Sequence, residues 1–135
     1  MTENPGGNSW MVRLDDIHLK LESAAGQVNI LRGLSLGIAA GETVSVVGPS
    51  GSGKSTMMMV IAGLERPTSG RALVSAQDLS VLNEDGLALF RRERIGIVFQ
   101  DFHLIPTMTA LENVAVPLEL AGARDGVQRA EAELG

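Results

Sequence analysis

The chain has 135 residues, of which 44% are hydrophobic and 20% charged, proportions typical of a folded globular protein and too apolar for a disordered one. A formal net charge of −5 and only 3% aromatic residues argue against nucleic acid as a partner, because phosphate backbones require basic surfaces and single strands require stacking platforms. The absence of cysteine excludes disulfides and thiolate metal sites. At this length we expect one domain or less.

The first nine residues are polar and contain Pro5, Gly6 and Gly7, without the basic and apolar regions of a secretory signal. We expect residues 1–9 to be a flexible tail. The densest apolar run, residues 57–64, is far shorter than the ~18 residues that a membrane helix requires. The sequence therefore predicts a protein with no membrane span of its own, whose contact with a membrane would come through a partner.

Two alternating apolar patterns, over residues 11–21 and 28–38, predict an antiparallel β ribbon, and the first slips near Asp15-Asp16, where a turn or a bulge would fit. Residues 43–47 are short and β-branched, as in a buried parallel strand. A glycine-rich loop separates them from a predicted helix over residues 54–64, which is apolar nearly all round. Such a helix needs sheet on more than one side, so we expect an α/β core.

The second half of the chain predicts further short elements. Arg71 to Ser75 is a candidate strand, residues 84–94 a helix with Leu87, Leu89 and Phe90 facing inward, and residues 95–99 a second buried parallel strand. Thr109 and Glu112 form a potential capping box for a helix that ends near Ala121, and another helix begins at Val127. We expect the N-terminal part of the core to cover residues 10–108 and the start of an incomplete helical subdomain to cover 109–135.

The segment Gly48-Pro49-Ser50-Gly51-Ser52-Gly53-Lys54-Ser55 matches the phosphate-loop pattern G-x-x-x-x-G-K-[ST], with the required strand before it and helix after it. Its glycines let backbone N–H groups turn inward to form an anion nest, to which the helix N-terminus adds partial positive charge. Lys54 would reach the β- and γ-phosphates, and the Ser55 hydroxyl would bind Mg²⁺. The predicted nucleotide-binding residues are Gly48, Ser50, Gly51, Ser52, Gly53, Lys54, Ser55 and Thr56.

The alternative, a glycine-rich turn that only connects strand to helix, does not require Lys-Ser at this offset. A regulatory GTPase would need Asn-Lys-x-Asp and Asp-x-x-Gly, and neither pattern occurs in the sequence. A small-molecule kinase stays open, although no arginine-bearing lid is recognisable.

Further motifs give the chain its family resemblance. Val98-Phe99-Gln100, the stretch from Ile61 to Gly70, and Ala110-Leu111-Glu112-Asn113-Val114 together resemble ATP-binding subunits of ABC transporters over about residues 11–122. Residues 99–107 resemble most the lipoprotein-releasing and macrolide-export branch. The resemblance implies the α/β fold of a P-loop NTPase of the ABC type, with an N-terminal antiparallel ribbon and without the C-terminal half.

The resemblance also implies roles and partners. Gln100 would contact Mg²⁺ and the attacking water and would be catalytic together with Lys54, and its loop would dock on a transmembrane permease subunit. A second ATP-binding domain would complete a dimer, and the protein would lie in the cytoplasm on the inner face of the cell membrane. ATP and Mg²⁺ are the cofactors expected.

Two features depart from the family pattern. The loop over residues 21–26, where an aromatic residue usually stacks on adenine, has none. The sequence also lacks a Leu-Ser-Gly-Gly-Gln signature, an Asp-Glu strand end and a following switch histidine. We therefore expect ATP binding without hydrolysis, and low stability or self-association where apolar surface is left uncovered. Three interpretations stay open: a transporter ATPase subunit in truncated form, a nucleotide-binding module without turnover, and a non-functional remnant.

Overall fold

The structure is a computed structural model that describes residues 9–24 and 26–135. The predicted tail, residues 1–9, lies outside the described residues except for Ser9. The chain divides into two compact units, residues 1–96 and 97–135, and each is described by itself. The predicted division between residues 108 and 109 remains a prediction.

The first unit contains a four-stranded antiparallel sheet in the order β2-β1-β3-β4. Its strands are β1 (Trp10–Ser23), β2 (Gly26–Ala39), β3 (Ser69–Val74) and β4 (Gln77–Asp78). Leu14 pairs with Leu36 on β2 and with Ala72 on β3, so β1 lies at the centre of the sheet. The predicted antiparallel ribbon is confirmed, and both of its strands extend beyond the predicted limits at both ends, since the pairing runs from Trp10 and Ala39 to Ser23 and Gly26.

The bulge predicted near Asp15-Asp16 is also confirmed. The register of β1 shifts between Leu14 and Ile17 against β2, and Asp16 has a positive φ of 50°. The backbone N–H of Asp16 donates to Ser35 Oγ over 3.0 Å, which compensates for the interrupted ladder. Because a bulge adds one residue, Leu14 and Ile17 both reach the core although they are an odd number of positions apart.

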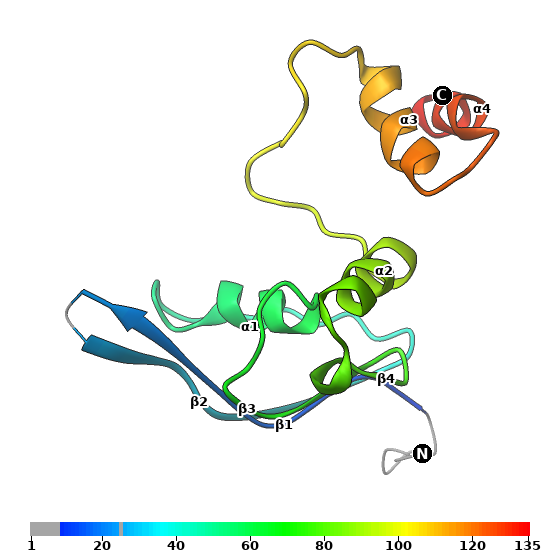
Figure 1. Ribbon diagram of the computed structural model, residues 1–135. Helices are drawn as coiled ribbons and strands as arrows, with labels where there is room; N and C mark the ends of the chain where they lie inside the picture. Colours follow the sequence, from blue (N-terminus) through cyan, green and yellow to red (C-terminus); the bar gives the residue numbers. More distant parts are fainter. Residues whose placement is uncertain (1–8, 25) are drawn as a thin grey trace. The chain divides into compact units, whose positions relative to one another are not determined.

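One face of the sheet carries the core, and two helices cover it (Figure 1). These are α1 (Lys54–Ile61) and α2 (Glu84–Arg94), with the short 3-10 helix η1 (Leu79–Val81) between β4 and α2. The core consists of Val12, Leu14, Ile17, Leu19, Leu31, Met57, Val60, Ala72, Val74, Leu79, Leu87 and Phe90.

Two details of these helices differ from the prediction. Leu87 and Phe90 are buried, but Leu89 is exposed, because positions 87 and 90 are about one turn apart whereas 89 points about 100° away from 90. Helix α1 ends at Ile61, before Gly63, which has a φ of 68° and lies beyond the last turn. Of the three consecutive methionines of α1, only Met57 is buried.

The two parallel strands predicted for residues 43–47 and 95–99 are not formed. Neither segment belongs to the described sheet, and both leave apolar side chains exposed, with Val47 at 89% and Val98 fully exposed. The composition is that of buried strands, but a parallel strand forms only where a neighbour supplies its ladder of hydrogen bonds. The described sheet is antiparallel throughout and offers no such neighbour.

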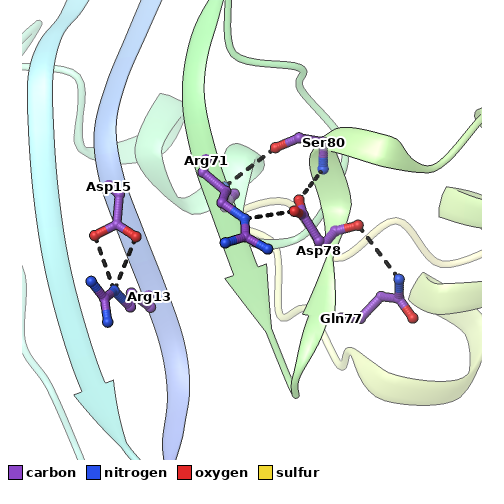
Figure 2. Close-up of polar contacts among 7 residues, drawn as sticks. Arg13, Asp15, Arg71, Gln77, Asp78 and Ser80 are labelled. Carbon is purple, nitrogen blue, oxygen red and sulfur yellow. Dashed lines mark hydrogen bonds and ion pairs between the residues drawn. The ribbon is translucent and has the colours of Figure 1, made fainter. Parts of the chain in front are cut away.

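Polar contacts secure the edge of the sheet at β3 and β4 (Figure 2). Arg71 Nε lies 2.7 Å from Asp78 Oδ2, and the backbone N–H of Ser80 donates to Asp78 Oδ1 over 3.0 Å. Burial by itself would raise the pKa of Asp78, but the hydrogen bonds from Arg71 and Ser80 and the charge of Arg71 outweigh it, so that the pKa lies below its ordinary value. On β1, Arg13 pairs with Asp15.

The second unit contains α3 (Ala110–Leu120) and α4 (Gly126–Leu134). The predicted capping box is confirmed: Thr109 Oγ1 accepts from the N–H of Glu112, and the Glu112 carboxylate accepts from the N–H of Thr109. The carboxylate of Glu112 accepts from the N–H of Thr109 and also from its hydroxyl, over 2.9 Å, and these two bonds, the backbone one most, hold the pKa of Glu112 below its ordinary value. No helix among the described residues is long and apolar enough to cross a membrane.

Candidate nucleotide-binding site

The glycine-rich loop joins the extended residues 43–47 to α1 within the first unit. Gly51 and Gly53 have φ values of 78° and 89°, in the left-handed region that side-chain-bearing residues rarely adopt, and this explains why glycine occupies both positions. A β-carbon on Gly53 would lie 3.1 Å from Leu31 Cδ2 and 3.2 Å from the backbone oxygen of Ile30. The loop therefore ends directly against β2, and the sheet fixes where α1 begins.

Three backbone donors at the start of α1 are available to a ligand. The N–H of Met57 bonds to the oxygen of Gly53, but the described residues show no acceptor for the N–H groups of Lys54, Ser55 and Thr56. No side chain caps the helix at Gly53, and no acidic residue lies in its first turn. An anion is the ligand that such a terminus favours, since it satisfies the donors and interacts well with the helix dipole.

The ammonium group of Lys54 folds back onto the loop. Lys54 Nζ donates to the backbone oxygens of Gly48 over 2.8 Å and Pro49 over 2.6 Å, and lies 3.4 Å from Ser52 Oγ. A positive charge is thus held over the centre of the loop by neutral acceptors and by no carboxylate. An incoming phosphate can pair with it without displacing another anion.

The Ser55 hydroxyl lies on the exposed side of the first turn of α1, and the described residues show no hydrogen-bond partner for it. A lone hydroxyl fits Mg²⁺, which takes few protein ligands and completes its shell with substrate phosphates and water. The described part of the chain holds no cluster of three or more His, Asp or Glu side chains that could bind a metal by itself.

Gln100, the other predicted catalytic and metal-binding residue, belongs to the second unit, whereas the loop belongs to the first, and its role remains a prediction. The segment that follows it is organised by Asn113 on α3. The side chain of Asn113 accepts from the N–H of Ile105 over 2.8 Å and donates to the oxygens of Ile105, Met108 and Thr109. In the sequence, Asn113 was recognised only as part of a motif, and its role in holding the backbone of this segment was not predicted.

An exposed apolar pair near the hairpin end of β1 and β2 was also missed. Leu21 and Val28 face each other across β1 and β2 and are 43% and 44% exposed. Leu19 and Leu31, the pair nearest on the core side, are buried, and Leu31 supports Gly53. Side chains alternate along a strand, so Leu21 shares the core-facing side with Leu19. The apolar face of the sheet therefore continues past the end of the phosphate loop.

Comparison with known proteins agrees with this geometry. The family profile for ABC transporters matches residues 31–135, which include the whole loop, α1 and Gln100. The chain belongs to the ABC transporter family. Among curated relatives, the macrolide export ATP-binding/permease protein MacB of Brucella abortus is 46% identical over 122 residues, covering 90% of this chain and 19% of that protein. The methionine import ATP-binding protein MetN of Cupriavidus necator is 48% identical over 112 residues, covering 83% and 32%.

Solved structures of ABC cassettes have the same fold. The dimeric ATP-binding cassette MJ0796 in a post-hydrolysis state, bound to ADP and Pi, matches with a TM-score of 0.82 and 38% identity, over 90% of this chain and 55% of that one. A second dimeric structure of MJ0796 matches with a TM-score of 0.83 and 40% identity. The chain thus spans about half of these cassettes and less than a third of the curated relatives. The predicted α/β fold of an ABC ATP-binding domain is confirmed.

Proposed function

We propose that the chain is the nucleotide-binding part of an ABC transporter ATPase, and that it holds the phosphates of ATP on residues 48–56. The observation that carries the proposal is the loop itself. It combines three unbonded N–H groups at the start of α1 with the ammonium of Lys54, and no carboxylate of the described residues pairs with that ammonium. Family membership and the ADP-bound solved cassette support the same ligand.

The chemistry follows from the residues. The N–H groups of Lys54, Ser55 and Thr56 would donate to phosphate oxygens, as would the loop amides of Gly51 and Gly53. Lys54 would exchange its two carbonyl partners for the β- and γ-phosphates, which offer stronger, charge-assisted bonds. Ser55 and Gln100 would hold Mg²⁺, which would neutralise the negative charge that develops in phosphoryl transfer.

The remaining proposals concern the partners and the location of the chain in an assembled transporter. We propose that the chain works with a permease subunit and with a second ATP-binding domain, at the inner face of the cell membrane. The names of MacB and MetN describe export and import, and both proteins match this chain with similar identity. The likeness of residues 99–107 to the macrolide-export branch favours export as the direction.

Titration of the full chain with a fluorescent ATP analogue tests the proposal. Lys54→Ala removes a charge-assisted partner worth about 1.5–3 kcal/mol, so the affinity should fall roughly 10- to 150-fold. Lys20→Ala is the matched control, since Lys20 is an exposed lysine of the same unit that belongs to no predicted site. Equal affinities of the two variants would show that the loop is only a connector.

A second candidate is a nucleotide-binding module without turnover, because these 135 residues by themselves carry no Asp-Glu strand end and no signature motif. Measuring nucleotide binding and phosphate release on the same sample separates the two candidates. A remnant without function would fail in both measurements.

A further inference from the structure

Gln100 lies in a segment of the second unit that no hydrophobic core holds in place. Residues 97–109 are exposed throughout and belong to no helix or strand. The conformation of such a segment depends on contacts among its own residues, because no packed neighbour imposes one. Gln100 can therefore present its side chain in one direction only if some contact fixes the backbone on both sides of it.

His103 makes two contacts, and they lie one on each side of Gln100. The imidazole ring of His103 is tilted by 53° against the ring of Phe99, with the two centroids 4.9 Å apart, which is within the range that aromatic pairs prefer. Nδ1 of the same imidazole lies 2.8 Å from the backbone oxygen of Asp101. Phe99 precedes Gln100 and Asp101 follows it, so a single side chain holds both neighbours of Gln100.

The chemistry of His103 suits this arrangement. A backbone oxygen can only accept, so Nδ1 of His103 carries a proton and donates it to Asp101. The backbone of His103 has a φ of 51°, in the left-handed region, which His, Asn and Asp adopt more readily than other residues with side chains. A left-handed residue turns the chain, and this turn lets the ring at position 103 reach back to the ring at position 99.

The segment is anchored again just beyond His103. Ile105 is bonded to the side chain of Asn113 on both of its backbone groups: its N–H donates to Oδ1 over 2.8 Å, and its oxygen accepts from Nδ2 over 3.2 Å. Asn113 belongs to α3, whose start is fixed by the capping box. The backbone is thus held to a helix at Ile105, and the contacts of His103 extend that support back to Gln100.

We propose that His103 is a positioning residue, which holds the backbone around Gln100 so that the Gln100 side chain is oriented toward Mg²⁺. This role rests on the proposed function, in which Gln100 is a ligand of the ion. His103 would touch neither the nucleotide nor Mg²⁺ and would act only through Gln100. Loss of a group that orients a metal ligand commonly lowers metal affinity by about 10- to 100-fold. We expect the lower end of this range, because the contacts of His103 are exposed to solvent.

NMR relaxation of the backbone amides of the full chain, without nucleotide or metal, tests whether His103 holds Gln100. We expect an order parameter of about 0.8 at Gln100 in the parent chain and below about 0.6 in His103→Ala, values typical of rigid and of flexible backbone. His103→Asn should keep most of the order, since Asn also adopts the left-handed region and its side-chain amide can donate to the same oxygen.

Phe102→Ala is the matched control for this measurement. Phe102 belongs to the same segment and is 90% exposed, and the described residues show no ring contact for it. Its removal should leave the order at Gln100 unchanged. Equal order at Gln100 in the parent chain and in His103→Ala would overturn the proposal, as would an equal loss of order in Phe102→Ala.

Titration of the same samples with a fluorescent ATP analogue, with Mg²⁺ and with EDTA, tests whether this order serves the metal. The gain in affinity that Mg²⁺ gives should fall about tenfold in Gln100→Ala and in His103→Ala, and the affinity in EDTA should not change. The double variant should lose no more than Gln100→Ala alone, because a residue that acts through Gln100 has no effect once that side chain is removed. An additional loss in the double variant would show that His103 acts by another route and would contradict the proposal.

The single variants separate this role from the proposed function. An unchanged gain from Mg²⁺ in Gln100→Ala would contradict the assignment of Gln100 as a metal ligand, and with it the role of His103. A reduced gain in Gln100→Ala together with an unchanged gain in His103→Ala would leave the proposed function intact and overturn only the role of His103.

Discussion

Gly70 on β3 lies against the bulge of β1 so closely that a β-carbon at this position would be 2.8 Å from the backbone oxygen of Asp15 and still nearer to that of Asp16. Gly70 also has a φ of 98°. The bulge pushes the backbone of β1 toward β3, and only a residue without a side chain leaves room for it. The two strands are thus fitted to each other at Asp16 and Gly70.

Gly70→Ala should therefore lower the free energy of unfolding by more than about 2 kcal/mol, from a strained φ and from backbone overlap together. Gly41→Ala is the control, because Gly41 has a φ of 78° but open space around the added carbon. It should cost about 1 kcal/mol, from conformational strain alone. Urea unfolding of both variants measures the two losses of unfolding free energy. Equal losses would show that the close approach of the two backbones adds nothing to the cost of the substitution.

Ser55→Ala should remove the Mg²⁺-dependent part of ATP binding and leave Mg²⁺-free binding unchanged. The reason is that the hydroxyl is a proposed ligand of the ion, whereas the amide of residue 55 still donates to phosphate. Titrations with Mg²⁺ and with EDTA measure the two parts. Ser55→Thr keeps a hydroxyl and should behave like the parent chain. A parallel loss with and without Mg²⁺ would indicate that the first turn of α1 is disturbed.

Leu21→Trp should increase ATP affinity several-fold. Leu21 and Val28 form an exposed apolar pair on β1 and β2, and we expect adenine to lie there without an aromatic partner. An indole there adds stacking on the base. Affinity for inorganic tripolyphosphate, which has no base, should not change. Val81→Trp controls for an added exposed aromatic, and an equal gain for tripolyphosphate would mean that the effect is not base stacking.

Asp78→Asn should destabilise the first unit by about 1 kcal/mol at neutral pH, through loss of the bonds to Arg71 and Ser80 shown in Figure 2. Because folding lowers the pKa of Asp78, its contribution is complete above the ordinary carboxyl range, near about pH 4, and is lost as the pH falls through the lowered pKa. The difference between variant and parent should therefore shrink on acidification. Gln27→Ala, at an exposed residue of β2 that carries no titratable group, is the control.

The 135-residue chain should bind ATP without steady hydrolysis. Loss of one positioned catalytic group commonly reduces the rate by a factor of about 10²–10⁴, and this sequence lacks the family's acidic strand end, signature and switch histidine together. Phosphate release by the purified chain is the measurement. Turnover that disappears in Lys54→Ala would show that a carboxylate within these residues acts as the base.

How far the sequence predicts the structure depends on the range of the interaction. The capping box of Thr109 and Glu112, the bulge at Asp16 and the loop before Lys54 follow from local chemistry, and the first two are confirmed. Val44 and Val46 have the pattern of a buried strand, yet no local rule supplies the neighbour that buries them. The role of Asn113 was missed for a related reason, since a side chain that bonds to four backbone groups leaves no periodic signal in the sequence.

The register of β1 also determines when the first unit can be completed during synthesis. One edge of β1 pairs with β2, which follows it after a short connection. Its other edge pairs with β3, which is synthesised much later. The hydrogen bond from the N–H of Lys20 to Thr68 Oγ1, for example, joins positions 48 residues apart. Closing such a loop is slow compared with forming a hairpin. The phosphate loop and α1 lie inside this closure. The hairpin of β1 and β2 can thus form during synthesis well before β3 completes the sheet that supports the phosphate loop.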